Sequence, residues 1–345
     1  MPSFSRPWLL LFATMFALFS AGRADAGQAS LTAKIKLNNA YQLSGPYTYK
    51  NLAVYLIHSS SKISDKRLIP LSEALDNRLV TIHETGEVNR LTAQNHSQDT
   101  YVFIQSGDMV KGGRQDRTLA QDLILPPKSK KIALDAFCVE HGRWRQRGKE
   151  SASTFSSSKK QLSSKALKLA AKKAKSQQEV WQAVAAEQQR LGRKVGKSVQ
   201  NPTSATSLQL SLEDKTLEKN RSLYQQALLP MGRREANAVG FADAIGGHFN
   251  AADIFGSPDL FQKLWPKLIE VAANEAIALE DSNTAVAVPQ SAAVRDQILD
   301  ALATPKKEEP SGHYTRRKSS DTQSNYVFET RDEKDQLIHL NIIKK

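Results

Sequence analysis

The sequence contains only one cysteine, Cys138, in 345 residues. A single thiol excludes an internal disulfide and a cysteine-based metal cluster, and a chain of this length buries enough core to fold without either. Cys138 shares a face, at period two, with the apolar residues of the run 132–139 (IALDAFCV), so we predict a buried structural residue. The alternative is a nucleophile with His141 as its base, which requires a sharp turn at the strand end.

Long apolar runs are missing after the first 26 residues, and no later stretch approaches the roughly 20 residues of a membrane-spanning helix. At the N-terminus, Arg6 precedes the short apolar run 8–19, and residues 24–26 (ADA) form an A-x-A cleavage site. This order is typical of a secretory signal peptide over residues 1–26, with an uncleaved anchor as the alternative. We therefore expect an exported chain with no transmembrane segment after signal removal, periplasmic in a Gram-negative host and secreted otherwise.

Recognisable catalytic signatures are also missing. The chain has no nucleophile elbow, HExxH, CxxC or GxGxxG pattern, and residues 107–117 lack the Gly-Lys-Ser/Thr ending of a Walker loop. The sequence therefore names no reaction, cofactor or metal. Asp108, Asp116, His141 and His339 would serve as metal ligands only if the fold brings them together.

The charge is far from balanced, because 48 Lys and Arg residues against 35 Asp and Glu residues give +13. Arg6 and Arg23 against Asp25 contribute +1 of this charge within the predicted signal, which leaves +12 for the mature chain. Such an excess favours anionic partners, namely a small molecule, a polymer or an envelope surface.

Residues 151–178 form the densest basic block, with seven lysines and no acidic residue. We expect a flexible or helical arm exposed to solvent, and the functional alternative is contact with an anionic membrane or polymer. Only Phe155 interrupts the lysines as an aromatic residue. Since single-stranded nucleic acids bind to stacked aromatic platforms, nucleic acid is not an expected partner.

Two short polar runs follow strongly apolar segments, namely residues 105–117 (QSGDMVKGGRQDR) and 138–144 (CVEHGRW). Glycines allow a ligand to approach the backbone closely, and arginine matches the geometry of carboxylates and phosphates. The predicted ligand-binding residues are Asp108, Lys111, Gly112, Gly113, Arg114, Gln115, Arg117, Arg143 and Trp144. The alternative for the first run is a solvated turn whose aspartates and arginines pair with one another.

Three residues in these runs are candidates for catalysis. Asp116 or Glu140 would act as general base and His141 as proton shuttle. Arg117 or Arg143 would then clamp an anionic substrate. The structural alternative is that Arg143 pairs with a buried acid and that Trp144 closes the end of a sheet sandwich.

The first half of the chain has the pattern of β-strands. Short runs rich in Val, Ile, Leu and aromatic residues alternate with turn-like clusters at 95–99, 107–113 and 126–131, a spacing typical of an antiparallel sandwich. The expected strands cover residues 51–58, 79–83, 101–105, 119–125 and 132–139. Residues 71–75 predict one helical turn capped by Ser72.

The second half predicts helices and hairpins. Helical periodicity covers residues 177–193, 212–229 and 294–302, and a further helix begins at Ser257-Pro258 and is kinked or split by Pro266. Gly246-Gly247 predicts a two-residue hairpin, and residues 326–329 and 337–343 predict another. Residues 304–324 have the composition of a polar linker.

The sequence thus predicts an α+β fold, with an antiparallel β-sandwich-like N-terminal half and the helices and β-hairpins of the second half packed on it. Residues 27–148 form the β-rich half, and residues 149–200 contain the Lys/Ser/Ala-rich segment and a helix. Residues 201–345 form the α+β half, which completes one module with residues 27–148.

Four segments together resemble a known family. These are GDMVKGGRQDR (107–117), LDAFCVEHGRW (134–144), SQQEVW (176–181) and residues 240–269 (GFADAIGGHFNAADIFGSPDLFQKLWPKLI). They occur in the order seen in the ARG and rhodanese-phosphatase-superfamily-associated domain, a bacterial domain of uncharacterised activity. The resemblance implies one α+β module from about residue 51 to the end, including His339, and it carries over no catalytic residue. The signal peptide, the lysine-rich block and Asp116 in place of an asparagine depart from that pattern.

Three functions are compatible with these observations. The first is a non-enzymatic envelope protein, binding or accessory, for an anionic ligand or partner. The second is a hydrolase acting on a phosphorylated or nucleotide-like substrate, which requires the two polar runs to meet in space. The third is a structural envelope component that contacts anionic surfaces through the lysine block.

Overall fold

The computed structural model describes, beyond Met1, residues 34–59, 67–280 and 287–345. The predicted signal peptide, residues 1–26, lies outside this part of the chain. Residues Ala33–Lys345 form one compact unit. Among the described helices, none is long and apolar enough to cross a membrane.

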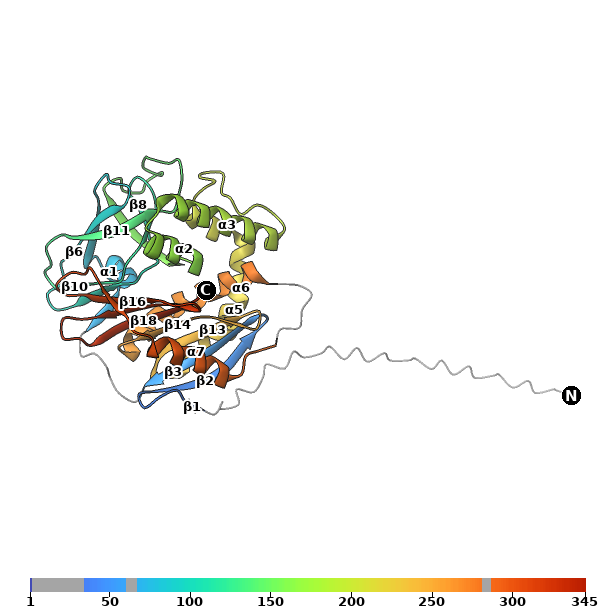
Figure 1. Ribbon diagram of the computed structural model, residues 1–345. Coiled ribbons are helices and arrows are strands. Elements are labelled where there is room, and N and C mark those ends of the chain that lie inside the picture. Colours follow the sequence, from blue (N-terminus) through green and yellow to red (C-terminus); the bar gives the residue numbers. More distant parts are fainter. Residues whose placement is uncertain (2–33, 60–66, 281–286) are drawn as a thin grey trace. The chain divides into compact units, whose positions relative to one another are not determined.

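A nine-stranded antiparallel sheet joins the two ends of the compact unit (Figure 1). Its N-terminal hairpin pairs with strands from the last third of the chain, since β3 lies directly beside β13 and β14 beside β18. In spatial order the strands are β1 (Ile35–Lys36), β2 (Tyr41–Tyr49), β3 (Leu52–Ser59), β13 (Ala238–Ile245), β14 (His248–Phe255), β18 (Leu337–Lys344), β17 (Asn325–Arg331), β16 (Arg316–Asp321) and β15 (Lys307–Glu309).

The residues between β3 and β13 build a second layer of strands. Six of them close into a barrel in the order β11 (Ile132–Cys138), β6 (Arg90–Asn95), β5 (Val80–Glu84), β12 (Thr154–Leu162), β8 (Asp108–Gly112) and β9 (Arg117–Leu119). A small sheet adjoins it, with β10 (Leu123–Leu125), β7 (Tyr101–Ile104) and β4 (Leu68–Pro70), in which β4 and β7 run parallel.

Helices cover both faces of the nine-stranded sheet. The described helices are α1 (Leu71–Asp76), α2 (Lys165–Leu169), the π-helix η1 (Ala170–Ala174), α3 (Gln177–Val195), α4 (Leu208–Leu212), α5 (Lys215–Arg234), α6 (Pro258–Leu279) and α7 (Ser291–Ala303). Alternate residues of β3 enter two different core clusters, one containing α6 and the other α7. This alternation is what a strand buried on both faces requires.

Helix α6 is the centre of the larger core. It packs against β13 of the sheet, β12 of the barrel and the neighbouring helix α5. Phe261 and Trp265 are fully buried and stack at tilted angles with a ring-centroid distance of 5.5 Å. Apolar burial on this scale is the main favourable term in folding.

The structure confirms the predicted α+β class, with a strand-rich first half and helices concentrated in the second. Gly246 and Gly247, both at positive φ, form the two-residue turn between β13 and β14. The helix α6 begins at the predicted position, where the Ser257 hydroxyl accepts from the Leu260 N–H and caps it. Cys138 is buried, as its position on the apolar face of β11 predicted.

Several local predictions were wrong because tertiary partners outweighed local composition. Residues 304–324 are not a linker, since β15 and β16 pair there and Glu308 lies opposite Lys318 across the two strands. Within the predicted turn 107–113, residues 108–112 form the strand β8 instead, because β12 provides its partner. Residues 119–125 contain the last residue of β9 and the whole of β10 rather than one strand.

Helix boundaries also differ at two predicted positions. The α1 helix begins after Pro70, and no side chain caps it, so Ser72 is not a cap. Pro266 does not split α6, which continues to Leu279 because its neighbours Trp265 and Leu268 are held in the core. Tertiary packing here outweighs the loss of one helical hydrogen bond.

The lysine-rich block is not an exposed arm. It forms the barrel strand β12 and then α2 and η1, which we call the lysine helix (residues 165–174). Lys168 and Lys172 are buried, and a Cβ on Gly107 would lie 2.8 Å from the Lys168 side chain. Gly107 therefore provides room for a buried lysine.

Candidate functional site

The two polar runs lie side by side in the structure. Strands β9 and β11 are neighbours, and Arg117 pairs with Cys138 in their register. The Val139 N–H donates to the Asp116 carbonyl at 3.0 Å. As a result the end of the first run meets the start of the second. Residues 140–150, which include the end of the second run, follow β11, and we call them the arginine loop.

A buried ion cluster joins the arginine loop to the barrel. Asp116 and Glu140 have no exposed surface. Arg147 donates to both oxygens of Asp116, at 2.8 and 3.1 Å, and Arg143 Nε donates to Glu140 at 2.7 Å. Paired donation of this kind fixes both the position and the orientation of a guanidinium.

Two serines from the region before α4 complete this cluster. Ser204 donates to Glu140 at 2.5 Å, and Ser207 donates to Asp116 at 3.4 Å. Ser207 also accepts from the Leu210 N–H as the N-cap of α4. The cluster therefore binds the arginine loop, the barrel and the start of α4 into one rigid unit.

Burial and pairing shift the pKa values of Asp116 and Glu140 in opposite directions. Burial raises the pKa of Asp116, and the Arg147 charge only partly offsets this effect. Burial also raises the pKa of Glu140, but hydrogen bonds from Arg143 and Ser204 outweigh it, so the Glu140 pKa lies below its ordinary value. Pairs with diverging pKa values occur in acid–base catalysis, yet both of these carboxyls lack solvent access.

Several predicted ligand-binding residues are internal. Arg117 is fully buried, donates to Cys138 Sγ at 2.8 Å and lies 3.4 Å from a Glu84 carboxylate oxygen. Gln115 is buried, and its carbonyl accepts from Arg117 at 3.2 Å. Asp108 is buried too, where Lys267 donates to it at 2.9 Å. Arg117, Gln115 and Asp108 therefore make contacts within the protein and do not face solvent.

Gly112 and Gly113 of the first run lie close against the residues of β12. A Cβ on Gly112 would lie 2.8 Å from the Thr154 carbonyl, and one on Gly113 would lie 2.3 Å from the Phe155 ring. Both residues also have positive φ. The glycines are therefore required for the close approach of β12.

The exposed part of the two runs surrounds Trp144. Its side chain is 42 % exposed, and the guanidinium carbons of Arg114 and Arg117 lie 5.5 and 5.6 Å from its ring centroid. Arg114, His141 and Arg145 are exposed as well, and Lys111 is half-buried. We call the four exposed residues Arg114, His141, Trp144 and Arg145 the Trp144 surface. The indole does not close the end of a sandwich.

The Cys138–His141 pair does not have the arrangement of a nucleophile and its base. Cys138 is fully buried, and burial raises the pKa of its thiol to about 11. His141 instead contacts Trp181 edge-on, with ring centroids 4.4 Å apart. In the described residues no three His, Cys, Asp or Glu side chains form a metal-binding group, and Asp108, Asp116, His141 and His339 contact different partners.

His339 occupies a second buried cluster, between the sheet and the barrel. Its Nδ1 lies 2.7 Å from Asp122 and its Nε2 lies 2.8 Å from Asp253. Burial lowers the pKa of His339, but the two carboxylates outweigh burial and raise it. A protonated ring donates to both carboxylates, and it links β14 and β18 to Asp122, the residue before β10, through one side chain.

The comparison with protein families gives one match. The family model of the ARG and Rhodanese-Phosphatase-superfamily-associated Protein domain matches residues 40–343. The chain belongs to this family. Searches of the curated proteins and of the solved structures found no match. The family domain thus covers the nine-stranded sheet apart from β1, the barrel and both buried clusters.

Sequence reasoning missed how this family member uses its lysine helix. Lys168 and Lys172 lie four residues apart on one helical face, and their charges lower the pKa values of Asp253 and Asp122, respectively, against the effect of burial. Helical spacing of the two lysines was the available signal. The acidic partners of these lysines could not be predicted, because Asp122 and Asp253 lie more than 40 residues away in sequence.

A cleft lined by carboxylates was also missed. Three adjoining cavities share Lys165 and Asn250 between the lysine helix and the nine-stranded sheet. Asn250 donates at 2.8 Å to both Asp243 and Glu275. Burial and the nearby Glu275 charge raise the pKa of Asp243 to about 8. The cleft therefore contains a carboxyl that is protonated at neutral pH.

Proposed function

We propose that this chain is a cell-envelope binding protein that recognises an anionic ligand or partner at the Trp144 surface. The observation that carries this proposal is the exposure of Trp144, at 42 %, beside Arg114. Exposed aromatic and arginine side chains provide a large share of the binding energy at recognition surfaces. The charge of +13 favours anionic partners before contact occurs.

The buried ion cluster supports this role by holding the surface in place. Trp144 lies between Arg143 and Arg145 in a loop whose conformation is fixed by the pairing of Arg143 and Arg147 with internal acids. A recognition residue held by a rigid second layer loses little conformational entropy when it binds. The arginines inside the loop therefore position the exposed groups.

The two alternative functions have less support. A hydrolase that uses Asp116 or Glu140 needs one of these acids to reach a substrate, and both are fully buried and paired. A structural component held by lysines needs exposed cations, but Lys168 and Lys172 are internal. Lys173 is exposed yet paired with Asp321 at 2.6 Å.

The test is thermal unfolding of residues 27–345 with nucleotides, sugar phosphates and polyphosphate, each at low and moderate salt. A ligand present at about 100 times its Kd should stabilise the protein by about 2.7 kcal/mol. Trp144→Ala and Arg114→Ala should each remove most of the ligand-induced shift in unfolding temperature. The quenching of tryptophan fluorescence by the ligand should be reduced in the same two variants.

Arg67→Ala is the matched control, because Arg67 is a surface cation with 74 % exposure and only a 3.9 Å contact to Asp99. This variant should retain the full shift. A shift that survives Trp144→Ala and Arg114→Ala together would contradict the site. The absence of a shift with every anion would contradict small-anion recognition and direct attention to protein partners in envelope extract.

A further inference from the structure

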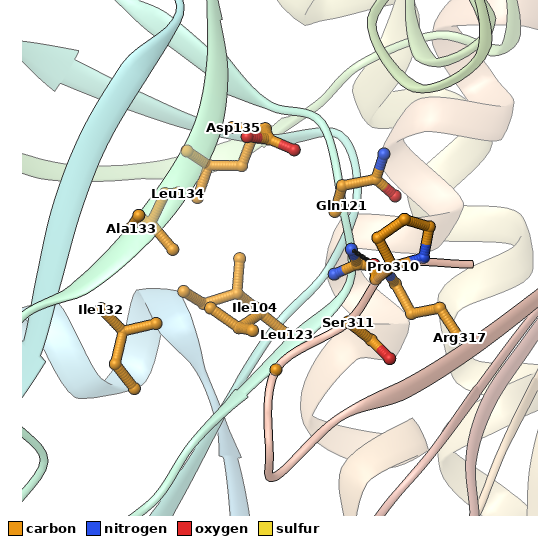
Figure 2. Close-up of a pocket in the computed structure, with 12 residues that line it drawn as sticks. Ile104, Gln121, Leu123, Ile132, Ala133, Leu134, Asp135, Pro310, Ser311 and Arg317 are labelled. Atoms are coloured by element: carbon orange, nitrogen blue, oxygen red, sulfur yellow. Dashed lines mark hydrogen bonds between the residues drawn. The ribbon is translucent and has the colours of Figure 1, made fainter.

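A pocket of about 290 Å³ opens between the barrel and the connection from β15 to β16 (Figure 2). It lies apart from the Trp144 surface, and none of its lining residues belongs to either polar run. Its lining residues are Ile104, Leu119, Gln121, Leu123, Ile132, Ala133, Leu134, Asp135, Pro310, Ser311, Gly312 and Arg317. A volume of this size is near the lower end of small-molecule sites.

The floor of the pocket is apolar. Ile104, Leu119 and Leu134 belong to the core cluster of the barrel, and Leu123 and Ile132 pack against that cluster while they remain partly exposed. The apolar side chains next to the barrel core are therefore only partly covered where they line this pocket. Apolar surface left facing water favours an occupant with an aliphatic or aromatic group.

Arg317 lines the same pocket without an acidic partner. Its two terminal nitrogens donate to the backbone carbonyls of Asp122, at 3.5 Å, and Pro310, while Nε is shielded from solvent and has no partner. No carboxylate in the described part of the chain forms an ion pair with it. In Figure 2 its side chain extends from β16 toward the apolar floor. A partly buried, unpaired cation favours an anion beside it.

Two acceptors complete the lining. Gln121 is 8 % exposed, and its carbonyl oxygen is buried with no hydrogen-bond partner. Asp135 is exposed on β11 and adds a negative charge to the lining. An occupant that satisfies both residues must carry N–H donors, and a positive charge would complement Asp135.

We propose that this pocket binds a free α-amino acid with an apolar side chain. The ligand carboxylate pairs with Arg317, its ammonium group donates toward Asp135 and Gln121, and its side chain covers Ile104, Leu123 and Leu134. A simple fatty acid would leave the Gln121 oxygen unpaired. A metal cation or a plain amine would leave Arg317 unpaired and would be repelled by it.

Isothermal titration of residues 27–345 with three matched compounds tests this assignment. L-Leucine carries both charged groups, 4-methylpentanoate lacks the ammonium group, and L-leucinamide lacks the carboxylate. L-Leucine should bind, and each analogue should bind at least tenfold more weakly because one buried or partly buried partner is left unpaired. L-Phenylalanine and glycine then measure the contribution of the apolar floor.

Arg317→Met keeps the apolar part of the side chain and should abolish L-leucine binding. Asp135→Asn alters an exposed position, so it should fold normally and weaken L-leucine more than 4-methylpentanoate. Arg316→Met is the control, since Arg316 lies next to Arg317 and pairs outward with Asp335 at 3.1 Å. It should leave binding unchanged.

Three results would overturn the proposal. These are no binding by L-leucine or L-phenylalanine, equal binding of 4-methylpentanoate and L-leucine, or L-leucine binding that survives Arg317→Met with unchanged affinity. Binding that is retained in Trp144→Ala would separate this pocket from the proposed anion surface, so the two proposals succeed or fail independently.

Discussion

The arginine loop and the lysine helix are both basic, and each directs two cations into the protein, namely Arg143 and Arg147 in the loop and Lys168 and Lys172 in the helix. The arginines contact acids directly, as Arg147 does with two hydrogen bonds to Asp116. Lys168 and Lys172 form no hydrogen bond to an acid in the described residues and act on Asp253 and Asp122 through their charge. The direct contacts to those acids come from neutral donors and His339.

This difference follows from the chemistry of the two cations. A guanidinium donates along fixed directions and replaces the hydration shell of a carboxylate, whereas an ammonium group is a compact point charge. The arginine loop thus specifies a geometry and can present Trp144 in one position. The lysine helix offsets the charges of Asp122 and Asp253 without direct contact. The positions of these two carboxylates are fixed by their hydrogen bonds to His339. Substitutions in and around the two regions test this division.

The largest effect is expected from His339→Ala. This change leaves Asp122 and Asp253 buried with only the lysine charges nearby, so the free energy of unfolding should fall by about 3–5 kcal/mol. Urea unfolding measures the loss. A loss below 1 kcal/mol would mean that Lys168 and Lys172 suffice, and that the histidine is not the main partner.

The same cluster predicts a pH dependence. The His339 pKa is raised, so its stabilisation is full below the unfolded value of 6.5 and is lost as pH rises through the folded value. The Asp122 and Asp253 pKa values are lowered, so their stabilisation is full above the unfolded value of 3.8 and is lost as pH falls. The cluster therefore stabilises most between about pH 4 and 6.5, and His339→Ala should remove this maximum.

Asp116→Ala is expected to cost about 2 kcal/mol, since the two hydrogen bonds that Arg147 donates to Asp116 are lost and a cavity is left in the buried cluster. Arg143 and Arg147 retain contacts to Glu140 and Glu150, which limits the loss. Thermal unfolding measures the change. Glu150→Gln, at a more exposed position in the same cluster, is the control and should cost less.

Asp243→Asn should stabilise the protein at pH 8. Because burial raises the Asp243 pKa to about 8, the folded state holds a proton that the unfolded state releases above pH 3.8, and stability falls as pH rises between these values. The amide removes this slope, so the stability of Asp243→Asn relative to the unchanged protein should increase steadily from pH 4 to pH 8. An unchanged slope would show that Asp243 ionises normally and that the charge of Lys165 reaches this carboxyl.

The smallest effect is expected from Arg147→Lys, which keeps the charge and removes the paired donation. A cost of about 1 kcal/mol should accompany weaker anion binding at the Trp144 surface, because the loop is less rigid. Lys172→Met tests the other region, where loss of the charge should raise the Asp122 pKa, so acid unfolding should begin at a higher pH. If Arg147→Lys cost neither stability nor anion binding, the distinction between the arginine loop and the lysine helix would be removed.

Much of this arrangement could be read from local pattern. The strands around residues 51–58 and 132–139, the Gly246-Gly247 turn and the Ser257 cap depend on neighbours within a few residues, and the sequence predicts them well. The meeting of the two polar runs was a requirement of one functional hypothesis, and the structure meets it.

The burial of individual charges could not be read in this way. Whether Arg117 is a ligand-binding cation or an internal one depends on Glu84, 33 residues away, and on the overlying Trp144. The Gln121–Arg317 pocket joins residues nearly 200 positions apart. Contacts over such distances are determined by the topology of the sheet and barrel, and they cannot be predicted from local composition.

The placement of β3 beside β13 has a consequence for biosynthesis. At elongation rates of roughly 5–20 residues per second, the nearly 180 residues between these strands take on the order of 10–40 s to synthesise. During this interval β3, which is buried along its whole length, has only the β2 hairpin as a partner. The nine-stranded sheet forms only when the final strand β18 has left the ribosome. A nascent chain with an uncovered apolar strand is a substrate for holding chaperones, and its refolding yield should decrease as protein concentration rises.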